Sequence, residues 1–531
     1  MKKTLALLLA LVTLLSVCSL TALAEETLEP VTIKMAIWDI PVLCESSDDF
    51  TKEDGKYYDA RWAYMAEKFN VRFEYVPLEY NTHQEKLRIM INGDDMPDVM
   101  ISTLGISEYM GYCEDEMLTL LPEGYEENYP HIKAALELIK QRDAYKYDGQ
   151  YYAVPRALES AEPYVDYNSS FYYRKDLAKA AGVEIKDYYT VDEVYDMYEK
   201  VQAANPDMTM FGHIWPDNIQ QLGLVEYVPE LSTGGFYYNA DQGKYVWAWA
   251  DESMADGIRT MKKFYDAGFL SKDFYNDPFY EARNQFWNGT LFSYFDGFDF
   301  LFFNQAMSGF LTNDPTADAE SMIGYAYLLD KDGNMQAKES GNSWSEYIFR
   351  HDCDEKVIDR FLAMYDYLLS DEGIMLCYYG IEDKDWKWGE DGAIVSLRTI
   401  DEATGKPVPF NKDGEAVSDL VHPFFPGAME DSKIANLSDK YSPFVKETVN
   451  HFWTLRKEFP KLKVLAYDND LALFNGDFYS KSGTLKPMEA VYKIVYEQTP
   501  ETVGDAWQQY LNENAGMVQN ILDELNAGIQ K

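Results

Sequence analysis

The first hundred residues alternate short apolar runs with helix-like segments, and this alternation constrains the fold more than any other feature of the sequence. Residues 31–38 (VTIKMAIW) and 71–77 (VRFEYVP) have strand patterns, whereas residues 60–69 (ARWAYMAEKF) have the apolar spacing of a helix. Residues 83–92 again predict a helix, and residues 99–101 a strand. A strand–helix–strand order predicts a parallel sheet with helical crossovers, so we expect an α/β fold.

The segment INGDDMPDVM (residues 91–100) joins the second helix to the third strand. Gly93 suits the left-handed conformation that ends a helix, and Pro97 fixes the backbone just before the strand. In open parallel sheets, ligands bind beyond the carboxyl ends of the strands. We therefore expect ligand contacts from the residues that end the first and third strands: Trp38, Asp39, Ser102 and Thr103.

Length and the absence of repeats indicate several domains that share the chain. The chain has 531 residues, too many for one hydrophobic core, which suggests two or three domains. Asp148 and Gly149 predict a hairpin turn followed by a strand. Thr190 and Glu193 form a capping box for a helix that extends to Ala204. Because no low-complexity linker separates these patterns, we expect interlaced domains.

Charge and the N-terminal segment indicate an exported protein. Lys and Arg total 47 against 90 Asp and Glu, a net charge of -43, which excludes a nucleic-acid partner because phosphate binding needs a positive surface. Lys2 and Lys3 precede an apolar run at residues 5–15, and an A-x-A site follows at residues 22–24. We therefore predict a signal peptide over residues 1–24. No later segment has the apolar length of a membrane span.

Cys18 raises the alternative that a lipid anchors the protein to the membrane. Cys18 in LSVC resembles the lipidated cysteine of a bacterial lipoprotein signal, but Val17 occupies a position where Gly or Ala is usual. Cleavage after Ala24 is favoured, with lipidation of Cys18 as the alternative. The remaining four cysteines have no CxxC pair and no zinc-binding spacing, so we expect buried free thiols. They are Cys44, Cys113, Cys353 and Cys377.

Seven segments occur in an order that resembles a known family. They are NGDDMPDV, DGQYYAVP, FYYRKDLAKAAGV, FYDAGFLSKDF, FWNGTLFSYFDG, MYDYLLSDEG and YYGIEDKDWKW. This order, from about residue 31 to 380, is similar to that of the bacterial extracellular solute-binding proteins of family 1, in the branch that takes up sugars and oligosaccharides for ABC importers. The last 150 residues match less closely.

The resemblance implies a two-lobed α/β fold of the type II periplasmic-binding-protein class, with interlaced lobes, a hinge and a central cleft. It places the chain crossings near Pro155, Met322 and Gly373. The expected division is residues 25–155 and 322–372 for the first lobe, and residues 156–321 and 373–531, with C-terminal helices, for the second. Ligand would bind in the cleft and be buried by hinge closure.

Aromatic residues make up 15% of the chain. Aromatic faces beside carboxylates and amides suit a sugar, which has apolar C–H faces ringed by hydroxyls, and they also suit a cationic ligand. The family's corresponding segments line the cleft, which adds the expected contacts Trp215, Phe295, Asp296, Phe298 and Trp344. Arg156, Trp386 and Trp388 are further candidates. The alternatives are an ion pair for Arg156 and loop or hinge packing for the two tryptophans.

Signatures of enzymes and metal sites are incomplete. Residues 341–345 give G-x-S-x-S, which lacks the second glycine of a nucleophile elbow. The sequence has neither a GxxxxGK[ST] phosphate loop nor an H-x-x-x-H pair. In LLDKDGN (residues 328–334) the glycine is fourth instead of sixth for a calcium loop, so we predict a hairpin turn. Carboxylates of a glycosidase are recognised by their separation in space, so a secreted glycoside hydrolase stays an alternative.

These patterns together predict a non-enzymatic, exported substrate-binding component of an ABC importer. We expect a small-molecule ligand, most simply a sugar or oligosaccharide, with a peptide or cationic metabolite as the alternative. The expected partners are the permease subunits of the importer. We predict a monomer without cofactor or metal.

Overall fold

The structure is a computed structural model. It describes residues 28–38, 60–79, 82–157, 164–165, 170–214, 220, 222–228, 230–231, 235–276, 281–339, 341–390, 394–398, 441–465 and 478–528. Among the helices of these ranges, none is long and apolar enough to cross a membrane.

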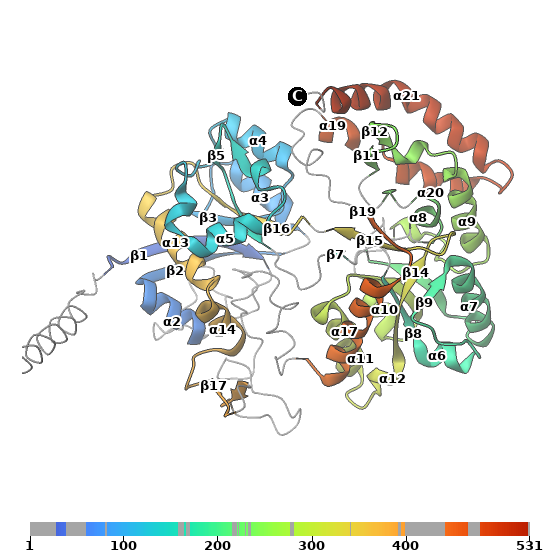
Figure 1. The fold of residues 1–531 in the computed structure, drawn as a ribbon, viewed down its shortest axis with the longest axis horizontal. Helices are drawn as coiled ribbons and strands as arrows, with labels where there is room; N and C mark the ends of the chain where they lie inside the picture. The colour runs from blue at the N-terminus through green and yellow to red at the C-terminus, as the bar shows by residue number, and fades with distance from the viewer. Residues whose placement is uncertain are drawn as a thin grey trace, which may run out of the picture. The chain divides into compact units, whose positions relative to one another are not determined.

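The first sheet has five strands in the order β2-β1-β3-β16-β6 (Figure 1). Its first three strands are β1 (Val31–Trp38), β2 (Val71–Leu78) and β3 (Val99–Ser102). β1 pairs in parallel with β2 from Val31↔Val71 to Trp38↔Leu78, and in parallel with β3 at Met35↔Val99. Helices α2 (Ala60–Phe69) and α3 (His83–Asn92) make the crossovers. The parallel order predicted from the alternation is therefore confirmed.

The joint between α3 and β3 differs from its prediction in one respect. Gly93 has φ −90°, so it does not take the left-handed conformation, whereas Asp94 does, with φ 55°. Gly93 is required for a different reason. A Cβ atom at this position would lie 2.8 Å from the carbonyl oxygen of Ile89, closer than real contacts allow.

The other two strands of the first sheet are antiparallel to each other. They are β6 (Val154–Ala157) and β16 (Ser343–Phe349). The register runs Ser343↔Ala157, Glu346↔Pro155 and Tyr347↔Val154, with a shift between Ser343 and Glu346. A shift of this kind is a β-bulge, which bends a strand and re-aims its side chains.

The second sheet has eight strands, with a path β10-β13-β8-β14-β15-β19 and with β7 and β9 paired to β15 and β14 (Figure 1). The strands are β7 (Tyr164–Val165), β8 (Ser170–Arg174), β9 (Tyr188–Thr190), β10 (Thr209–His213), β13 (Leu291–Phe295), β14 (Ile323–Leu329), β15 (Met335–Glu339) and β19 (Leu462–Leu465). β10 and β13 are parallel, with His213 opposite Phe295, so their carboxyl ends lie at the same edge. This edge is a second candidate position for a ligand.

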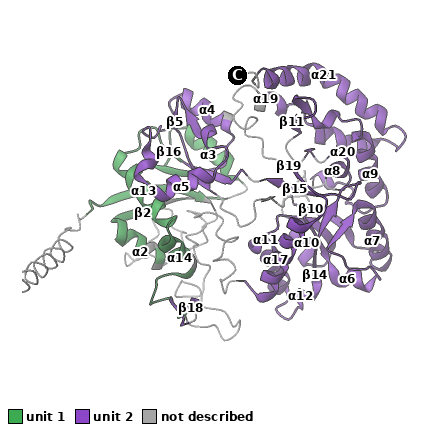
Figure 2. Ribbon diagram, viewed as in Figure 1, with its two compact units in different colours: residues 1–101, 348–386, 396–424 green, residues 102–347, 387–395, 425–531 purple. Residues whose placement is uncertain are grey.

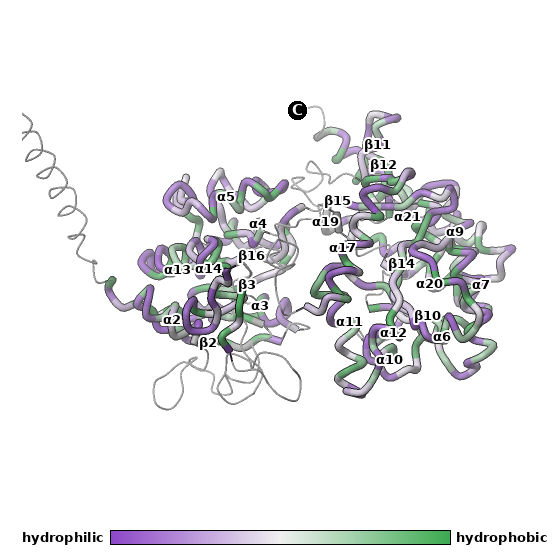
Figure 3. The backbone as a smooth tube through the Cα atoms, turned by 60° about the horizontal axis from the view of Figure 1, so that its bottom comes forward, coloured by the Kyte–Doolittle hydropathy of each residue, from purple (hydrophilic) through white to green (hydrophobic). Residues whose placement is uncertain are grey.

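Helices pack against both sheets, for example α13 (Glu355–Leu368) against β1 and α10 (Glu281–Trp287) against β13. Other helices of the chain include α4 (Ile106–Glu114), α7 (Val191–Ala204), α8 (Leu224–Tyr227), α9 (Met254–Asp266), α11 (Phe300–Asn313), α14 (Asp371–Tyr379), α17 (Pro443–Glu458), α20 (Pro487–Glu497) and α21 (Val503–Gly528). All residues of β14 are buried. Helix α13 alternates hydrophobic and hydrophilic residues (Figure 3). The capping box predicted at Thr190 and Glu193 is confirmed at the start of α7.

Both predicted hairpins are present. β4 (Lys146–Tyr147) and β5 (Gln150–Tyr151) pair around Asp148 and Gly149, both of which have positive φ. β14 and β15 pair through Leu329↔Met335, so residues 330–334 form the turn predicted for LLDKDGN.

The chain divides into two compact units, each built from several segments (Figure 2). One comprises residues 1–101, 348–386 and 396–424, and the other residues 102–347, 387–395 and 425–531. The lobe boundaries predicted from the sequence stay a prediction.

Candidate ligand-binding site

A chain of hydrogen bonds follows the carboxyl end of β3. Ser102 is fully buried, and its Oγ lies 2.5 Å from the hydroxyl of Tyr109 on α4. The backbone N–H of Leu104 donates to Ser102 Oγ at 3.3 Å and to the Tyr109 oxygen at 3.0 Å. The Tyr109 hydroxyl in turn donates to Oε1 of Glu346 on β16. These bonds fix the turn that contains the half-buried Thr103.

The bulge of β16 holds an arginine and a tryptophan together. Arg156 on β6 is fully buried, and its Nη1 donates to Ser345 Oγ at 2.8 Å. Its guanidinium carbon lies 5.5 Å from the ring centre of Trp344 and 5.7 Å from that of Tyr347. Both distances lie within the range of cation–π attraction. Trp344 itself is only half-buried.

The backbone of this bulge has an unusual conformation. Ser345 has φ 63° and Asn342 has φ 61°, values that residues other than glycine rarely adopt. Such positions cost on the order of 1–3 kcal/mol each and are concentrated at functional sites. The strain at Ser345 lies beside Trp344, and the hydrogen bond from Arg156 to the Ser345 hydroxyl helps to hold it.

Further polar and aromatic side chains lie close to Ser343, the first residue of β16. Gln141 Nε2 donates to Ser343 Oγ at 3.0 Å, and the Tyr145 hydroxyl lies 3.4 Å from the same atom. Burial raises the pKa of Tyr145, so its hydroxyl stays protonated. Tyr152 links this group to the hydrogen-bond chain, since its ring centre lies 6.3 Å from Tyr145 and 5.3 Å from Tyr109.

Glu346 and Tyr109 are residues that the sequence analysis missed. Glu346 is only 4% exposed, and burial raises its pKa well above the ordinary value of a glutamate. The available signal was a single charged residue beside an apolar run, in the strand SWSEYIF. An isolated acid in such a strand is as readily placed on a solvated face, so the pattern alone did not select it.

The candidates at the edge of the second sheet are buried. Phe295 is fully buried, with ring centres 5.2 Å from Phe211 and 5.8 Å from Phe171. Phe298 is stacked on Tyr325 with ring centres 3.6 Å apart. Both rings therefore belong to the core in this structure, and ligand contact for them stays a prediction.

Asp296 forms an ion pair that the sequence did not reveal. Its Oδ2 accepts hydrogen bonds from Nε of Arg283, at 2.7 Å, and lies 2.7 Å from Nη2 of the same residue on α10. The Gly297 N–H donates to Oδ1 at 2.8 Å. Burial raises the pKa of Asp296 to about 6, and the Arg283 charge opposes this rise. The pair places a guanidinium and a carboxylate just beyond the end of β13.

The remaining predicted residues belong to other segments of the chain. Trp386 in β17 (Trp386–Trp388) is buried, and its Nε1 donates to the Gly380 carbonyl at 3.0 Å, whereas Trp388 is 50% exposed. Trp38 ends β1, with its backbone opposite Leu78. Asp39, Trp215 and Cys18 lie outside the described residues. The structure thus connects Ser102, Arg156 and Trp344 through residues of β16.

Neither a metal site nor a disulfide is found in the described part of the chain. No group of three or more His, Cys, Asp or Glu there could hold a metal ion. Cys113, Cys353 and Cys377 are buried and are not in disulfides, and burial raises the pKa of Cys113 and Cys353 to about 12. Free buried thiols were predicted for these positions. Cys44 lies outside the described residues.

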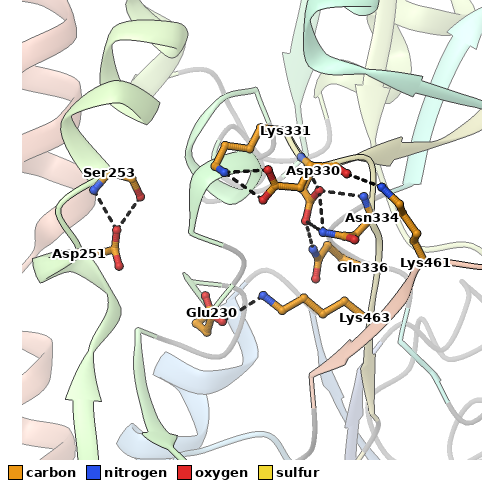
Figure 4. A network of polar contacts seen from close by, with 10 residues as sticks. Glu230, Asp251, Ser253, Asp330, Lys331, Asn334, Gln336, Lys461 and Lys463 are labelled. Carbon is orange, nitrogen blue, oxygen red and sulfur yellow. Dashed lines mark hydrogen bonds and ion pairs between the residues drawn. The ribbon is translucent and has the colours of Figure 1, made fainter. Parts of the chain in front are cut away.

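The DKDGN turn owes its conformation to hydrogen bonds (Figure 4). The Asp330 carboxylate accepts from the backbone N–H groups of Asp332 and Asn334 at 2.9 and 2.8 Å. It also accepts from the side-chain amides of Asn334 and Gln336 at 2.8 and 2.7 Å. Because these donors occupy the carboxylate, the turn needs no cation to explain its conformation.

Part of the chain is similar to a known protein family. Residues 60–309 match a family model described as bacterial extracellular solute-binding protein. This match confirms the resemblance inferred from the order of the sequence motifs. Among curated proteins, none matches the sequence significantly.

Several solved structures share the fold over nearly the whole chain. The N-glycan transport solute-binding protein NgtS from Streptococcus pneumoniae is 15% identical with a TM-score of 0.60, and the match covers 94% of this chain and 98% of that one. The alginate-binding protein AlgQ2 is 14% identical with a TM-score of 0.63 and the same coverage. The S. pneumoniae ABC-transporter substrate-binding protein FusA, in complex with kestose, is 14% identical with a TM-score of 0.61, covering 93% and 99%. These likenesses confirm the predicted fold class, the α/β fold of two-lobed solute-binding proteins.

Proposed function

We propose that this chain is the exported substrate-binding component of an ABC importer and that its ligand is a sugar or oligosaccharide. The three solved structures described above are named for N-glycan transport, for alginate binding and for a complex with kestose. N-glycans, alginate and kestose are all carbohydrates. The observation that carries the proposal in this chain is the group formed by Arg156 and the half-buried Trp344. An indole face packs against the C–H face of a sugar ring, and a guanidinium donates to its hydroxyls.

The proposed contacts are the residues predicted from the sequence, with Arg156, Trp344 and Thr103 at the first sheet and Asp296 at the second. Arg156 favours a neutral or anionic ligand over a cationic metabolite, because its own positive charge is buried beside Trp344. We further propose that the chain binds without chemical conversion, acts as a monomer outside the cytoplasm, and delivers its ligand to permease subunits of the importer.

Calorimetric titration of the mature chain tests the ligand class. The panel consists of mannose- and N-acetylglucosamine-containing oligosaccharides, alginate fragments, fructans, peptides and amines. We expect binding to members of one carbohydrate group only. Chromatography of the titrated mixture should return the ligand unchanged. A cleaved product whose formation stops on replacement of one carboxylate would support the glycoside hydrolase alternative instead.

Substitution of Trp344 tests the site. Trp344→Ala should weaken binding of the cognate carbohydrate by roughly thirtyfold, the equivalent of about 2 kcal/mol for loss of a central aromatic contact. Tyr238→Ala is the matched control, because Tyr238 is an exposed aromatic residue on β11 (Phe236–Asn239) outside the proposed site. If both variants bind the carbohydrate as tightly as the wild type does, Trp344 is not part of the site. The ligand class is then still decided by the titration.

A further inference from the structure

One buried acid lies within the candidate site, next to the residues proposed to touch the ligand. Glu346 follows Trp344 and Ser345 in β16 and pairs with Pro155, the neighbour of Arg156. It is 4% exposed, and its carboxyl group accepts a hydrogen bond from Tyr109. A charged residue that is placed so deeply needs a reason, because burial of an uncompensated carboxylate costs several kcal/mol.

A chain of hydrogen bonds reaches Glu346 from the turn after β3. The Leu104 N–H donates to Ser102 Oγ and to the Tyr109 oxygen. Because the Tyr109 hydroxyl gives its one proton to Glu346 Oε1, its oxygen accepts the proton of the Ser102 hydroxyl. Glu346 is thus the final acceptor of a chain that begins in the turn after β3. Two segments that are distant in sequence, residues 102–104 and 344–346, are joined through it.

We propose that Glu346 is a positioning residue of the ligand-binding site, which fastens the turn after β3 to the bulge of β16 and thereby orients Trp344 and Arg156. The bulge needs such support because Ser345 has a strained φ of 63°. Arg156 supports it from β6 through Ser345 Oγ, and Glu346 supports it from β3 through Tyr109. The orientation of Trp344 therefore depends on both sides of β16. This inference rests on the proposed function, since it assigns Trp344 and Arg156 to the ligand.

The inferred role of Glu346 is that of a neutral acid. Within the described part of the chain, no ion pair includes Glu346, and burial alone raises its pKa well above the ordinary value. A protonated carboxyl group accepts the Tyr109 proton at Oε1 without placing a charge in the interior. Glutamine has the same shape and keeps an acceptor at this atom, so it should replace glutamate here, whereas alanine should not.

Hydrogen exchange measures the positioning without any ligand. In Glu346→Ala, amide exchange should accelerate in peptides that cover residues 102–109 and 343–347, and in Glu346→Gln it should stay as in the wild type. Tyr109→Phe keeps the ring and removes the hydroxyl, so it should accelerate exchange in the same two peptides. Glu339→Ala is the control, because Glu339 forms a surface pair with Lys140. Unchanged exchange in both Glu346→Ala and Tyr109→Phe would overturn the proposal.

Titration with the carbohydrate identified for the wild type then tests the consequence for the site. Glu346→Ala should weaken affinity by roughly tenfold and Glu346→Gln by less than about twofold. Difference infrared spectra of the wild type against Glu346→Gln should contain the stretching band of a protonated carboxyl group at neutral pH. A Gln variant as weak as the Ala variant would overturn the neutral positioning role.

The experiments distinguish an error in the role of Glu346 from an error in the proposed function. Loss of affinity in Trp344→Ala with full affinity in Glu346→Ala would leave the proposed function intact and refute the role of Glu346. Absence of carbohydrate binding by the wild type would refute the proposed function, whereas the exchange experiment would still decide whether Glu346 holds the bulge.

Discussion

Two buried acids, one at each sheet, show how different hydrogen-bond partners affect the pKa of a carboxyl group. Asp296, beyond the end of β13, receives hydrogen bonds from Arg283 and from the Gly297 N–H. Glu346, in β16, receives one from Tyr109. Burial raises the pKa of both carboxyl groups, but the Arg283 charge restrains that of Asp296, at about 6. Among the described residues, no charged group restrains the pKa of Glu346. A cation within contact distance offsets part of the desolvation cost, and a neutral donor offsets less.

The comparison is tested most severely by removal of the cation. Arg283→Met should leave Asp296 as an unpaired buried acid and lower the free energy of unfolding by about 3–5 kcal/mol at pH 8. Arg283→Met combined with Asp296→Asn removes both charges and should recover much of that loss. Urea unfolding of the three proteins measures these differences. If the single and double variants are equally unstable, Arg283 acts through packing, for example on the Phe302 ring 5.8 Å from its guanidinium, and not through its charge.

A second test uses the pH dependence of Asp296. Its folded pKa of about 6 lies above the ordinary 3.8, so the folded state binds the proton more tightly than the unfolded state. The free energy of unfolding of the wild type, relative to Asp296→Asn, should therefore fall as pH rises from 4 to 6 and then level off. The expected fall is roughly 2–3 kcal/mol, from about 1.4 kcal/mol per pKa unit. A difference that rises with pH over this range would show a carboxylate stabilised by Arg283, contrary to the comparison.

The local parts of the fold were predictable because their signals are local. The apolar spacing of residues 31–101 predicted the parallel order of β1, β2 and β3 correctly, and turn residues predicted both hairpins. The left-handed residue after α3 was assigned one position too early. Gly93 is needed for close approach to Ile89, and Asp94 takes the turn, a distinction that depends on a contact and not on composition.

The site was less predictable because its contacts join distant residues. The bulge at Ser345 arises from pairing with β6, and the sequence separation between Arg156 and Ser345 is 189 residues. Phe295 and Phe298 occupy strand-end positions typical of ligand contacts, but core aromatics share that pattern, and these two pack against other rings. Strand position predicts which edge a residue occupies. Whether its side chain faces solvent or core depends on packing against elements that the pattern does not specify.

A third acid, Glu226, extends the comparison, with a smaller expected effect on stability. Glu226 on α8 lines a cavity of about 20 Å³, space for about one water molecule, together with Asp330 and Gln336. Burial, followed by the nearby Asp192 and Asp330 carboxylates, raises the pKa of Glu226 to about 7, and Lys263 and Lys331 oppose this rise. The group thus combines partial burial with negative neighbours, the opposite of the Arg283 effect on Asp296. Because the pKa is raised in the folded state, ionisation destabilises the fold progressively between pH 4.5 and 7.

Glu226→Gln should therefore stabilise the protein at pH 8 and have no effect near pH 4, where the glutamate is protonated in both states. Solvent screens this partly exposed group, so the gain should stay below about 1 kcal/mol. Thermal melts at both pH values measure it, with Glu230→Gln as the control, since Glu230 pairs with Lys463 at 3.4 Å and its loss should be neutral or slightly destabilising. A gain of equal size at pH 4 and pH 8 would indicate better packing of the amide against the Gln336 carbonyl, which has no donor within the described residues. A gain confined to the higher pH would show that burial and the negative neighbours together raise the energy of the ionised Glu226, whereas the Arg283 charge lowers that of the ionised Asp296.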